Sequence, residues 1–303
     1  MLKIAHWFFF CILSFHCLFS TVIVRFRGQL GNQLFQAATG LALSLDRGCQ
    51  VAFPDFVRFK DPNWKANEEI VTNYHYFLSK VPNQTDDYRQ LHIYNEPNNP
   101  GYYPIPFQNH MEIVGYFISE KYFAKHKKLI RQIFVPSQEI VNDLYIRHAD
   151  IIQDPKTVAI HVRTGYPDYK GTGFNPTFYN AFMRPDMAFF KQAMDKFDDT
   201  YHFVIFSDHI GWCKKEFSKV NKKITYIEGQ DHIHDFFLIT LCKHVIIANS
   251  TFGWWAAYLN TNPQKRVICR LPFFGNKGEK PDVLCNTWEK IPSSYNIPFP
   301  KFK

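Results

Sequence analysis

The sequence lacks the short motifs that most directly reveal a metal or phosphate site. Its 303 residues contain no Cys-x-x-Cys pair, no Asp-x-Asp triplet and no Gly-x-Gly-x-x-Gly loop. These absences argue against a zinc ribbon, against a metal held by paired aspartates and against the common dinucleotide fingerprint. There is also no internal repeat and no low-complexity tract, which argues against a solenoid and against a largely disordered chain.

Cysteine is sparse and follows no regular spacing. Seven cysteines are scattered along the chain, at positions 11, 17, 49, 213, 242, 269 and 285. Two of them fall near the N-terminus, which leaves an odd number in the rest of the chain. Buried free thiols are therefore the expectation, and a disulfide such as Cys269–Cys285 is the alternative in an oxidising compartment.

The composition is that of a folded, moderately basic protein. Hydrophobic residues make up 46% of the chain and charged residues 20%, so its length suffices for one large or two modest α/β domains. Lys and Arg number 35 against 27 Asp and Glu, and the net charge of +8 favours an anionic sugar nucleotide or an anionic membrane surface as partner. Nucleic acid is not expected, because there is no basic stripe, zinc-finger spacing or RNA-binding signature.

The N-terminal segment differs from the rest of the chain. Lys3 precedes an apolar run over residues 4–19, which is typical of a signal peptide or a signal anchor. The run is shorter than the ~20 apolar residues of a comfortable membrane span. We therefore predict a leader over residues 1–20 that associates the chain with a membrane. Such a leader places a eukaryotic protein in the secretory pathway or Golgi lumen, and makes a bacterial one membrane-associated or exported.

An N-terminal α/β domain is predicted over residues 21–155. A strand over residues 21–26, a turn over residues 28–32 and a helix over residues 33–45 open a doubly wound unit. Residues 54–106 are rich in proline, asparagine and aromatic residues with little periodicity, and we expect irregular loops that shape a binding site.

The second half of the chain is predicted to form a C-terminal domain that binds a nucleotide sugar. Helical patterns over residues 121–134 and 137–148 precede Asp154-Pro155, which marks a domain boundary. Over residues 156–303 strands and helices then alternate, as in a nucleotide-binding fold.

A polar turn follows one of these strands and precedes a helix. The apolar run over residues 245–247 gives way to Asn249, Ser250 and Thr251, which suit the first residues of a helix. A helix start offers unpaired N–H groups at the positive end of the helix dipole, and both suit a phosphate oxygen. The alternative is an ordinary capped helix whose aromatic residues lie in the core.

Two other strands also end in polar residues. The strand over residues 157–162 ends at Arg163, whose guanidinium can bind a phosphate through two parallel hydrogen bonds. The strand over residues 202–206 is followed by Ser207 and Asp208. Ligands of α/β sheets bind at the carboxyl ends of the strands, so these side chains are candidates for one site. The alternative for each is a solvated surface group.

Five ordered motifs extend this pattern over nearly the whole chain, from about residue 22 to residue 288. They are GQLGNQLFQ at residues 28–36, GYFISEKYF at 115–123, HVR at 161–163, FSD at 206–208 and NSTFGWW at 249–255. In content and order they resemble the motifs of the α-1,2-fucosyltransferases of glycosyltransferase family 11. The members of that family are inverting enzymes that transfer fucose from GDP-β-L-fucose.

The resemblance implies a fold and an activity. The fold is GT-B-like, with two Rossmann-like doubly wound α/β domains that face a cleft and with the acceptor on the side of the N-terminal domain. The activity is transfer of L-fucose to the 2-hydroxyl of a galactoside on a glycan, with no metal and no further cofactor. The implied partners are GDP-fucose and a galactoside-containing glycan.

The resemblance also assigns the residues of the site. Arg163 would stabilise the charge that develops on the departing diphosphate, and Asp168 is the first candidate for a catalytic carboxylate. Asp235 matches a family aspartate too, but its place before a helix favours an N-cap. The residues expected to bind the donor are His161, Arg163, Ser207, Asp208, Asn249, Ser250, Thr251, Phe252, Gly28, Asn32 and Gln33.

The chain departs from the family pattern in two motifs. Thr164 takes the place of a second arginine, with Tyr166-Pro167 inserted before Asp168, and His209 takes the place of a second aspartate. Two alternatives to the α-1,2-fucosyltransferase activity therefore stay open. One is a transferase that acts on another GDP-sugar, and the other is a non-catalytic protein that binds a GDP-sugar or a glycan.

Overall fold

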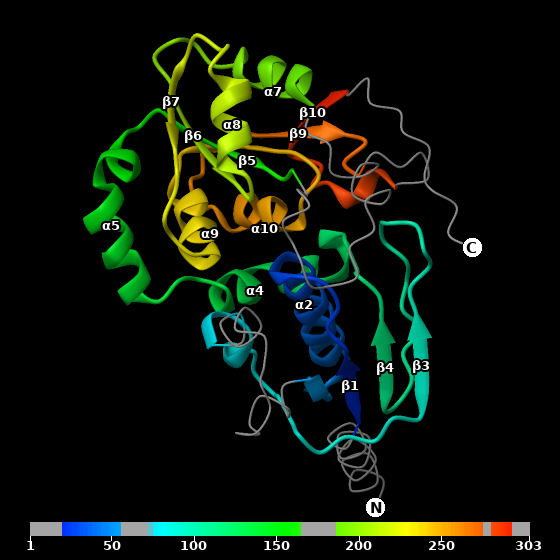
Figure 1. The fold of residues 1–303 in the computed structure, drawn as a ribbon. Coiled ribbons are helices and arrows are strands. Elements are labelled where there is room, and N and C mark those ends of the chain that lie inside the picture. The colour runs from blue at the N-terminus through cyan, green and yellow to red at the C-terminus, as the bar shows by residue number, and fades with distance from the viewer. Residues whose placement is uncertain (1–19, 56–72, 74, 165–185, 275–279, 293–303) are drawn as a thin grey trace, which may run out of the picture. The chain divides into compact units, whose positions relative to one another are not determined.

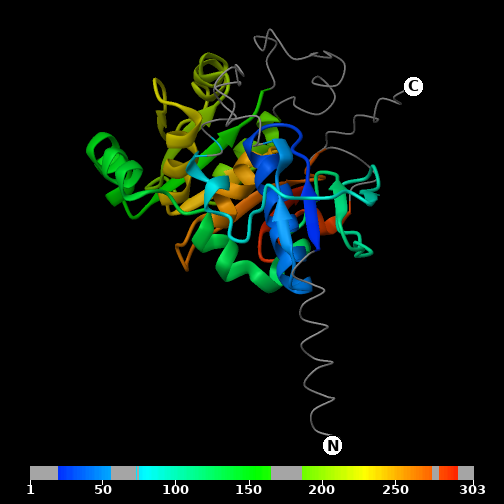
Figure 2. The same cartoon turned by 90° about the horizontal axis from the view of Figure 1, so that it is seen from below.

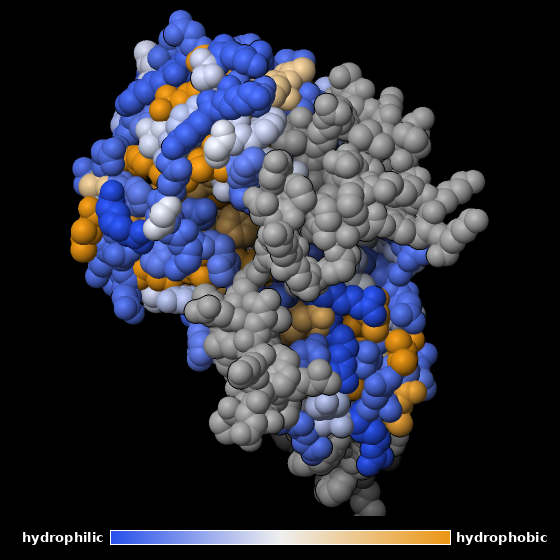
Figure 3. Space-filling view, in the orientation of Figure 1, coloured by the Kyte–Doolittle hydropathy of each residue, from blue (hydrophilic) through white to orange (hydrophobic). Residues whose placement is uncertain are grey.

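The computed structural model describes residues 20–55, 73, 75–164, 186–274 and 280–292 (Figure 1). The predicted leader, apart from Ser20, and the candidate Asp168 lie outside these residues. No helix within the described ranges combines the length and the apolar character that a bilayer-spanning segment requires. Hydrophilic residues predominate on the face shown in Figure 3, where hydrophobic ones form small separate patches.

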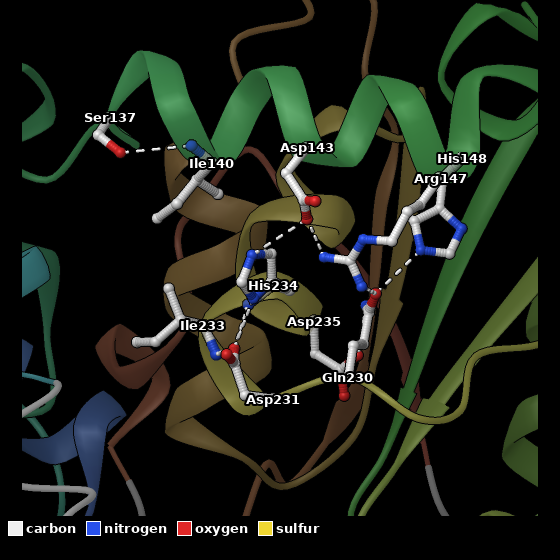
Figure 4. Close-up of polar contacts among 10 residues, drawn as sticks. All are labelled: Ser137, Ile140, Asp143, Arg147, His148, Gln230, Asp231, Ile233, His234 and Asp235. Atoms are coloured by element: carbon white, nitrogen blue, oxygen red, sulfur yellow. Dashed lines mark hydrogen bonds and ion pairs between the residues drawn. The ribbon is translucent and has the colours of Figure 1, made fainter.

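The chain divides into two compact units, residues 1–135 and residues 136–303. The division precedes the predicted boundary at residues 155/156, because helix α5 (Gln138–Gln153) packs on α9 (His232–Leu241) of the second unit. Figure 4 shows the polar side of this contact, where Arg147 and His148 of α5 both hydrogen-bond to Gln230, at 3.3 and 2.9 Å. His234 of α9 lies 3.3 Å from a carboxylate oxygen of Asp143.

The first unit is an α/β structure built on an all-parallel sheet with the strand order β2-β1-β4-β3. Helix α2 lies against β1, as both views show (Figure 1, Figure 2). Its described elements are β1 (Thr21–Val24), α2 (Leu30–Arg47), β2 (Gln50–Ala52), η2 (Leu78–Lys80), β3 (His92–Asn95), β4 (Met111–Val114), η3 (Glu120–Tyr122), η4 (Ala124–His126) and α4 (Lys127–Ile133).

Helix α2 is longer than predicted and fits tightly on the sheet. It starts directly after Gln29 and ends at Gly48, whose φ of 63° provides the left-handed residue that commonly terminates helices. Gly40 allows the close approach to β1, because an added Cβ would lie 2.3 Å from Cγ2 of Val24. The sequence also predicted one helix over residues 121–134, but the structure has two 3₁₀ turns followed by the short α4.

The second unit is doubly wound, as the sequence predicted. Its sheet is all-parallel with the order β7-β6-β5-β8-β9-β10, the 3-2-1-4-5-6 order of dinucleotide-binding folds. Its elements, besides α5 and α9, are β5 (Thr157–Val162), α7 (Met187–Met194), β6 (His202–Ser207), α8 (Ile210–Phe217), β7 (Lys223–Tyr226), β8 (His244–Ile247), α10 (Thr251–Leu259), β9 (Val267–Leu271), η5 (Pro281–Val283) and β10 (Glu289–Pro292).

Helices cover both faces of this sheet. Apolar side chains of α7 and α8, among them Phe190 and Phe217, pack in one buried cluster with alternate residues of β5 and β6, such as Ile160 and Ile205. Helix α10 lies on the other face and contacts α9. The five cysteines of the described residues, 49, 213, 242, 269 and 285, are buried, and no disulfide joins any two of them, as expected.

Candidate active site

The strand order of the second unit fixes where a ligand can bind. The connections from β5 and from β8 leave in opposite directions, and ligands of open parallel sheets bind at such a switch point, beyond the carboxyl ends of the two strands. His161 of β5 pairs with Ile247 of β8. Arg163 and Asn249 each follow two residues later, so they emerge from neighbouring strands at the same edge of the sheet.

Arg163 is held in place by the next strand. Its Nη1 lies 3.2 Å from Oδ2 of Asp208, and about a fifth of each side chain is exposed. The other oxygen of Asp208 accepts hydrogen bonds from the backbone N–H and the hydroxyl of Thr164, at 2.8 and 3.1 Å. A single carboxylate therefore fixes both the arginine and the turn that follows β5, which orients the guanidinium before a ligand arrives.

Ser207 and Asp208 build the turn after β6. The hydroxyl of Ser207 accepts the backbone N–H of His209 at 3.0 Å and lies 3.4 Å from Asp208 Oδ1. Three donors, from Arg163 and Thr164, already contact the Asp208 carboxylate, so the structure gives it a supporting role for Arg163. Sequence reasoning did not anticipate this ion pair, because it joins residues that are 45 positions apart in the chain.

Helix α10 presents its positive end at the same edge of the sheet. Ser250 is its N-cap residue, with an extended backbone and no side-chain capping hydrogen bond, and no acidic residue occupies the first turn. The start of the helix dipole is therefore not neutralised by a residue of its own turn. Asn249 and Ser250 are 1% and 8% exposed, which places them in a shielded environment where such a charge acts more strongly.

His161 lies beneath the start of α10. Its ring stacks on Phe252, with centroids 5.1 Å apart and an interplanar angle of 29°. Within the described residues, its buried Nδ1 has no hydrogen-bond partner. Burial lowers the pKa of His161 to about 4, with nearby Arg163 acting in the same direction and Asp208 against it. The imidazole is therefore neutral at physiological pH and can exchange a hydrogen bond with a ligand.

Gly253 explains the close contact between α10 and the sheet. A Cβ at this position would lie 2.9 Å from His161 Nδ1 and 3.1 Å from Ile247 Cγ2. Both distances are shorter than ordinary van der Waals contacts. The glycine therefore lets the helix start settle on β5 and β8, at the edge where Arg163 emerges.

Residues 28–36 belong to the first unit, where they organise the turn between β1 and α2. Gly28 has a φ of 73°, and an added Cβ there would lie 2.2 Å from Nδ2 of Asn32. The buried amide of Gln33 donates to the Gly28 carbonyl at 3.0 Å and accepts from Asn73 at 3.0 Å. The contacts of Gly28 and Gln33 are thus structural. A donor-binding role for these residues and Asn32 stays a prediction.

The predicted role of Asp235 as an N-cap was wrong. Asp231 caps α9, because its carboxylate accepts the backbone N–H groups of Ile233 and His234, at 2.9 Å each. Asp235 lies in the first turn of the helix and accepts a hydrogen bond from Gln230 at 2.7 Å. Burial raises its pKa to about 6, and the Gln230 contact opposes this shift.

The sequence model of glycosyl transferase family 11 matches residues 104–272, more than half of the chain. An alpha-1,2-colitosyltransferase of Escherichia coli is 27% identical over 278 residues, which cover 84% of this chain and 93% of that protein. The galactoside 2-alpha-L-fucosyltransferase SEC1 of Bos taurus is 27% identical over 248 residues, or 78% of this chain. The match spans 63% of the bovine protein.

Likeness to solved structures is weaker. The structure of POFUT1 in complex with GDP superposes with a TM-score of 0.47 at 12% identity, over 82% of this chain and 96% of that one. The family assignment thus comes from the sequence model, whose matched segment includes β5, β6 and β8 and the start of α10. The chain belongs to glycosyl transferase family 11.

Proposed function

We propose that this chain is an inverting glycosyltransferase that moves L-fucose from GDP-β-L-fucose to the 2-hydroxyl of a galactoside. The observation that carries the proposal is the convergence of Arg163 and the start of α10 at the switch point of the second sheet. Loss of GDP from the sugar leaves negative charge on the β-phosphate, and preplaced donors and positive charge at that phosphate lower the barrier. The family and the named fucosyltransferase relatives support this donor.

In this proposal the diphosphate lies between the guanidinium and the helix. Arg163 is oriented by Asp208, so little reorganisation accompanies binding. The N–H groups of the first turn of α10 and the Ser250 hydroxyl, which makes no capping bond, supply further donors. His161 contributes a hydrogen bond but no charge, because its imidazole is neutral. Asn249, Thr251 and Phe252 complete the donor site, with Ser207 and Asp208 beside it.

Attack on the face opposite the departing GDP inverts the anomeric carbon and requires a base near the acceptor hydroxyl. Asp168 is our candidate for that base, by its match to the family motif. We further propose that transfer needs no metal and no further cofactor, that the fold is GT-B-like, and that residues 1–20 act as a signal peptide or anchor that brings the chain to a membrane or into an exported compartment.

A second sugar has one specific observation in its favour. One relative, of whose length this chain covers 93%, is named a colitosyltransferase. A site that acts through Arg163 and backbone N–H groups binds the diphosphate, which all GDP-linked sugars share. Another GDP-linked deoxyhexose is therefore the second candidate donor.

Turnover with defined donors tests the proposal. The purified full chain, treated with EDTA, is incubated with GDP-fucose and lactose, and the product is identified by NMR. An α-linked fucose on the 2-hydroxyl of galactose is the expected product, and Arg163→Ala is the matched inactive variant. Transfer from a different GDP-sugar alone would select the second candidate. GDP binding without transfer from any GDP-sugar would select a non-catalytic protein.

A further inference from the structure

The central strands of the first sheet end in two loops that hold exposed side chains outside the predicted donor site. In its order β2-β1-β4-β3, the two central strands β1 and β4 pair side by side in parallel. Beyond the carboxyl ends of these strands lie the loop at residues 25–29 and the loop at residues 115–119. Ligands of open α/β sheets bind beyond the carboxyl ends of the strands, which is where these two loops lie. A transferase binds two substrates, and the second sheet accounts for one.

A buried glutamine ties the two loops together. Gln36 is fully buried in α2. Its amide nitrogen donates to the carbonyl of Gly115 at 2.9 Å, and its amide oxygen accepts the backbone N–H of Arg27 at 3.1 Å. One side chain therefore positions the backbone of both loops.

Glu96 clamps the loop after β4 from its other side. Its Oε2 accepts the backbone N–H groups of Tyr116 and Phe117, at 2.7 and 2.8 Å, and its Oε1 accepts the hydroxyl of Tyr122 at 2.9 Å. Gly115 makes this possible, because an added Cβ there would lie 2.5 Å from Cβ of Glu96. Burial raises the pKa of Glu96, and the two backbone hydrogen bonds oppose that rise.

The clamp holds a backbone conformation that the chain rarely adopts. Phe117 has a φ of 53°, a left-handed value that is unusual for a bulky residue. Its ring is fully buried and packs edge-on against Tyr122, with centroids 5.4 Å apart. Strain of this kind is concentrated at functional sites, where the surrounding structure enforces it.

The constraint leaves one side chain of each loop exposed. Tyr116 is one of the two residues whose backbone N–H Glu96 holds, yet 45% of it is exposed. Arg27 is exposed as well, although its backbone is fixed by Gln36. Within the described residues neither side chain has a hydrogen-bond or ion-pair partner. Rigid backbone beneath exposed aromatic and cationic side chains is the arrangement of a binding surface rather than of a core.

We propose that Tyr116 and Arg27 form a binding subsite for the acceptor glycan, with Glu96 and Gln36 as positioning residues. The inference rests on the transferase function proposed above and names the part of the protein that selects the acceptor. The Tyr116 ring stacks on the apolar C–H face of an acceptor sugar, and the Arg27 guanidinium donates hydrogen bonds to its hydroxyls. The clamped loops hold both groups at fixed places before the sugar binds.

The test separates acceptor binding from donor binding. In Tyr116→Ala we expect the KM for lactose to rise about ten-fold, the effect of losing one aromatic contact, with the KM for GDP-fucose changed less than two-fold. Tyr116→Trp should restore the lactose KM, since its ring also stacks. Glu96→Gln keeps the volume but loses an acceptor for Tyr122, so it should raise the lactose KM and leave the donor KM unchanged.

Tyr145→Ala is the matched control, because Tyr145 of α5 is 42% exposed and lies in the other unit. It should alter neither KM. A Tyr116→Ala enzyme with a lactose KM within two-fold of wild type would overturn the inference, as would equal changes in both KM values. If the wild type shows no turnover, the proposed function fails by itself. Saturation-transfer NMR with lactose and GDP then decides the inference, since binding must be weaker in Tyr116→Ala than in wild type.

Discussion

Nη1 of Arg163 lies 3.2 Å from Oδ2 of Asp208, and the two residues follow neighbouring parallel strands. The same carboxylate accepts two hydrogen bonds from Thr164. The guanidinium of Arg163, which follows β5, is thus held by a residue that follows β6. In the proposed reaction this geometry presents a positive charge at the switch point before the diphosphate binds, and the following predictions test its parts.

Loss of the Arg163 side chain should affect the chemical step most. Arg163→Ala removes one main charge-stabilising donor, and we expect transition-state stabilisation to fall by about 2–4 kcal/mol. The measurement is kcat/KM for GDP-fucose at saturating lactose. Arg163→Lys keeps the charge but not the forked geometry, so it should recover only part of the loss. A near-normal rate in Arg163→Ala would remove this residue from the mechanism.

Asp208→Asn should weaken catalysis through Arg163. The amide retains an acceptor for Thr164 but loses the charge that holds the guanidinium, so we expect kcat to fall about ten-fold, the scale of a charged hydrogen bond. Asp199→Asn is the control, because Asp199 also pairs with a cationic side chain, that of Lys222 at 2.6 Å, but is 91% exposed. Equal rates in the two variants would contradict a positioning role for Asp208.

Gly253→Ala should displace the start of α10. The new Cβ would lie 2.9 Å from the buried, stacked His161 ring, and such overpacking typically costs about 1–3 kcal/mol of stability. Gly211→Ala in α8 is the matched control, since its Cβ would meet nothing within 4 Å. Urea unfolding should show a lower midpoint for the first variant only, together with weaker GDP binding by calorimetry. Identical midpoints would show that the contact can relax.

His161 makes stability depend on pH in a defined window. Its pKa is lowered from 6.5 to about 4, so between these values the unfolded chain binds a proton that the folded chain does not. Stability from this group is therefore lost as pH falls from about 6.5 towards 4, by up to about 3 kcal/mol. Asp235, with a pKa raised to about 6, acts in the opposite direction over an overlapping range.

Comparison of wild type with His161→Gln isolates the histidine, because the Asp235 contribution is common to both. Chemical unfolding at pH 7 and pH 5 should show a larger loss of stability for wild type than for the variant. Equal losses in the two proteins would mean that His161 is protonated with equal ease in the folded and unfolded chains.

The sequence was most informative where local pattern and function coincide. The strands that end at Val162 and Ser207 were predicted to within one residue, because buried parallel strands form continuous apolar runs. The helix start at Thr251 also followed from its polar turn. These signals sufficed to predict a doubly wound unit and the residues at one edge of it.

The remaining features depend on contacts between distant residues. The Arg163–Asp208 pair, the attachment of α5 to the second unit and the clamp of Glu96 on the loop after β4 all join segments that no local pattern relates. The cap of α9 was misassigned because the continuous apolar run begins only after Asp235, whereas the helix already starts at His232. The break of residues 120–133 into short turns likewise follows from packing that propensity does not encode.

The Gln36 amide, which bonds to two loops, limits how this protein can evolve. Because Gln36 bonds to the backbone of Arg27 and of Gly115, any replacement there disturbs two loops at once, and the position has little freedom to vary. Tyr116 and Arg27 project from that backbone without supporting it, so they can be exchanged at little penalty to folding. Descendants of this protein could thus acquire new glycan preferences through a few surface substitutions while the scaffold beneath is conserved.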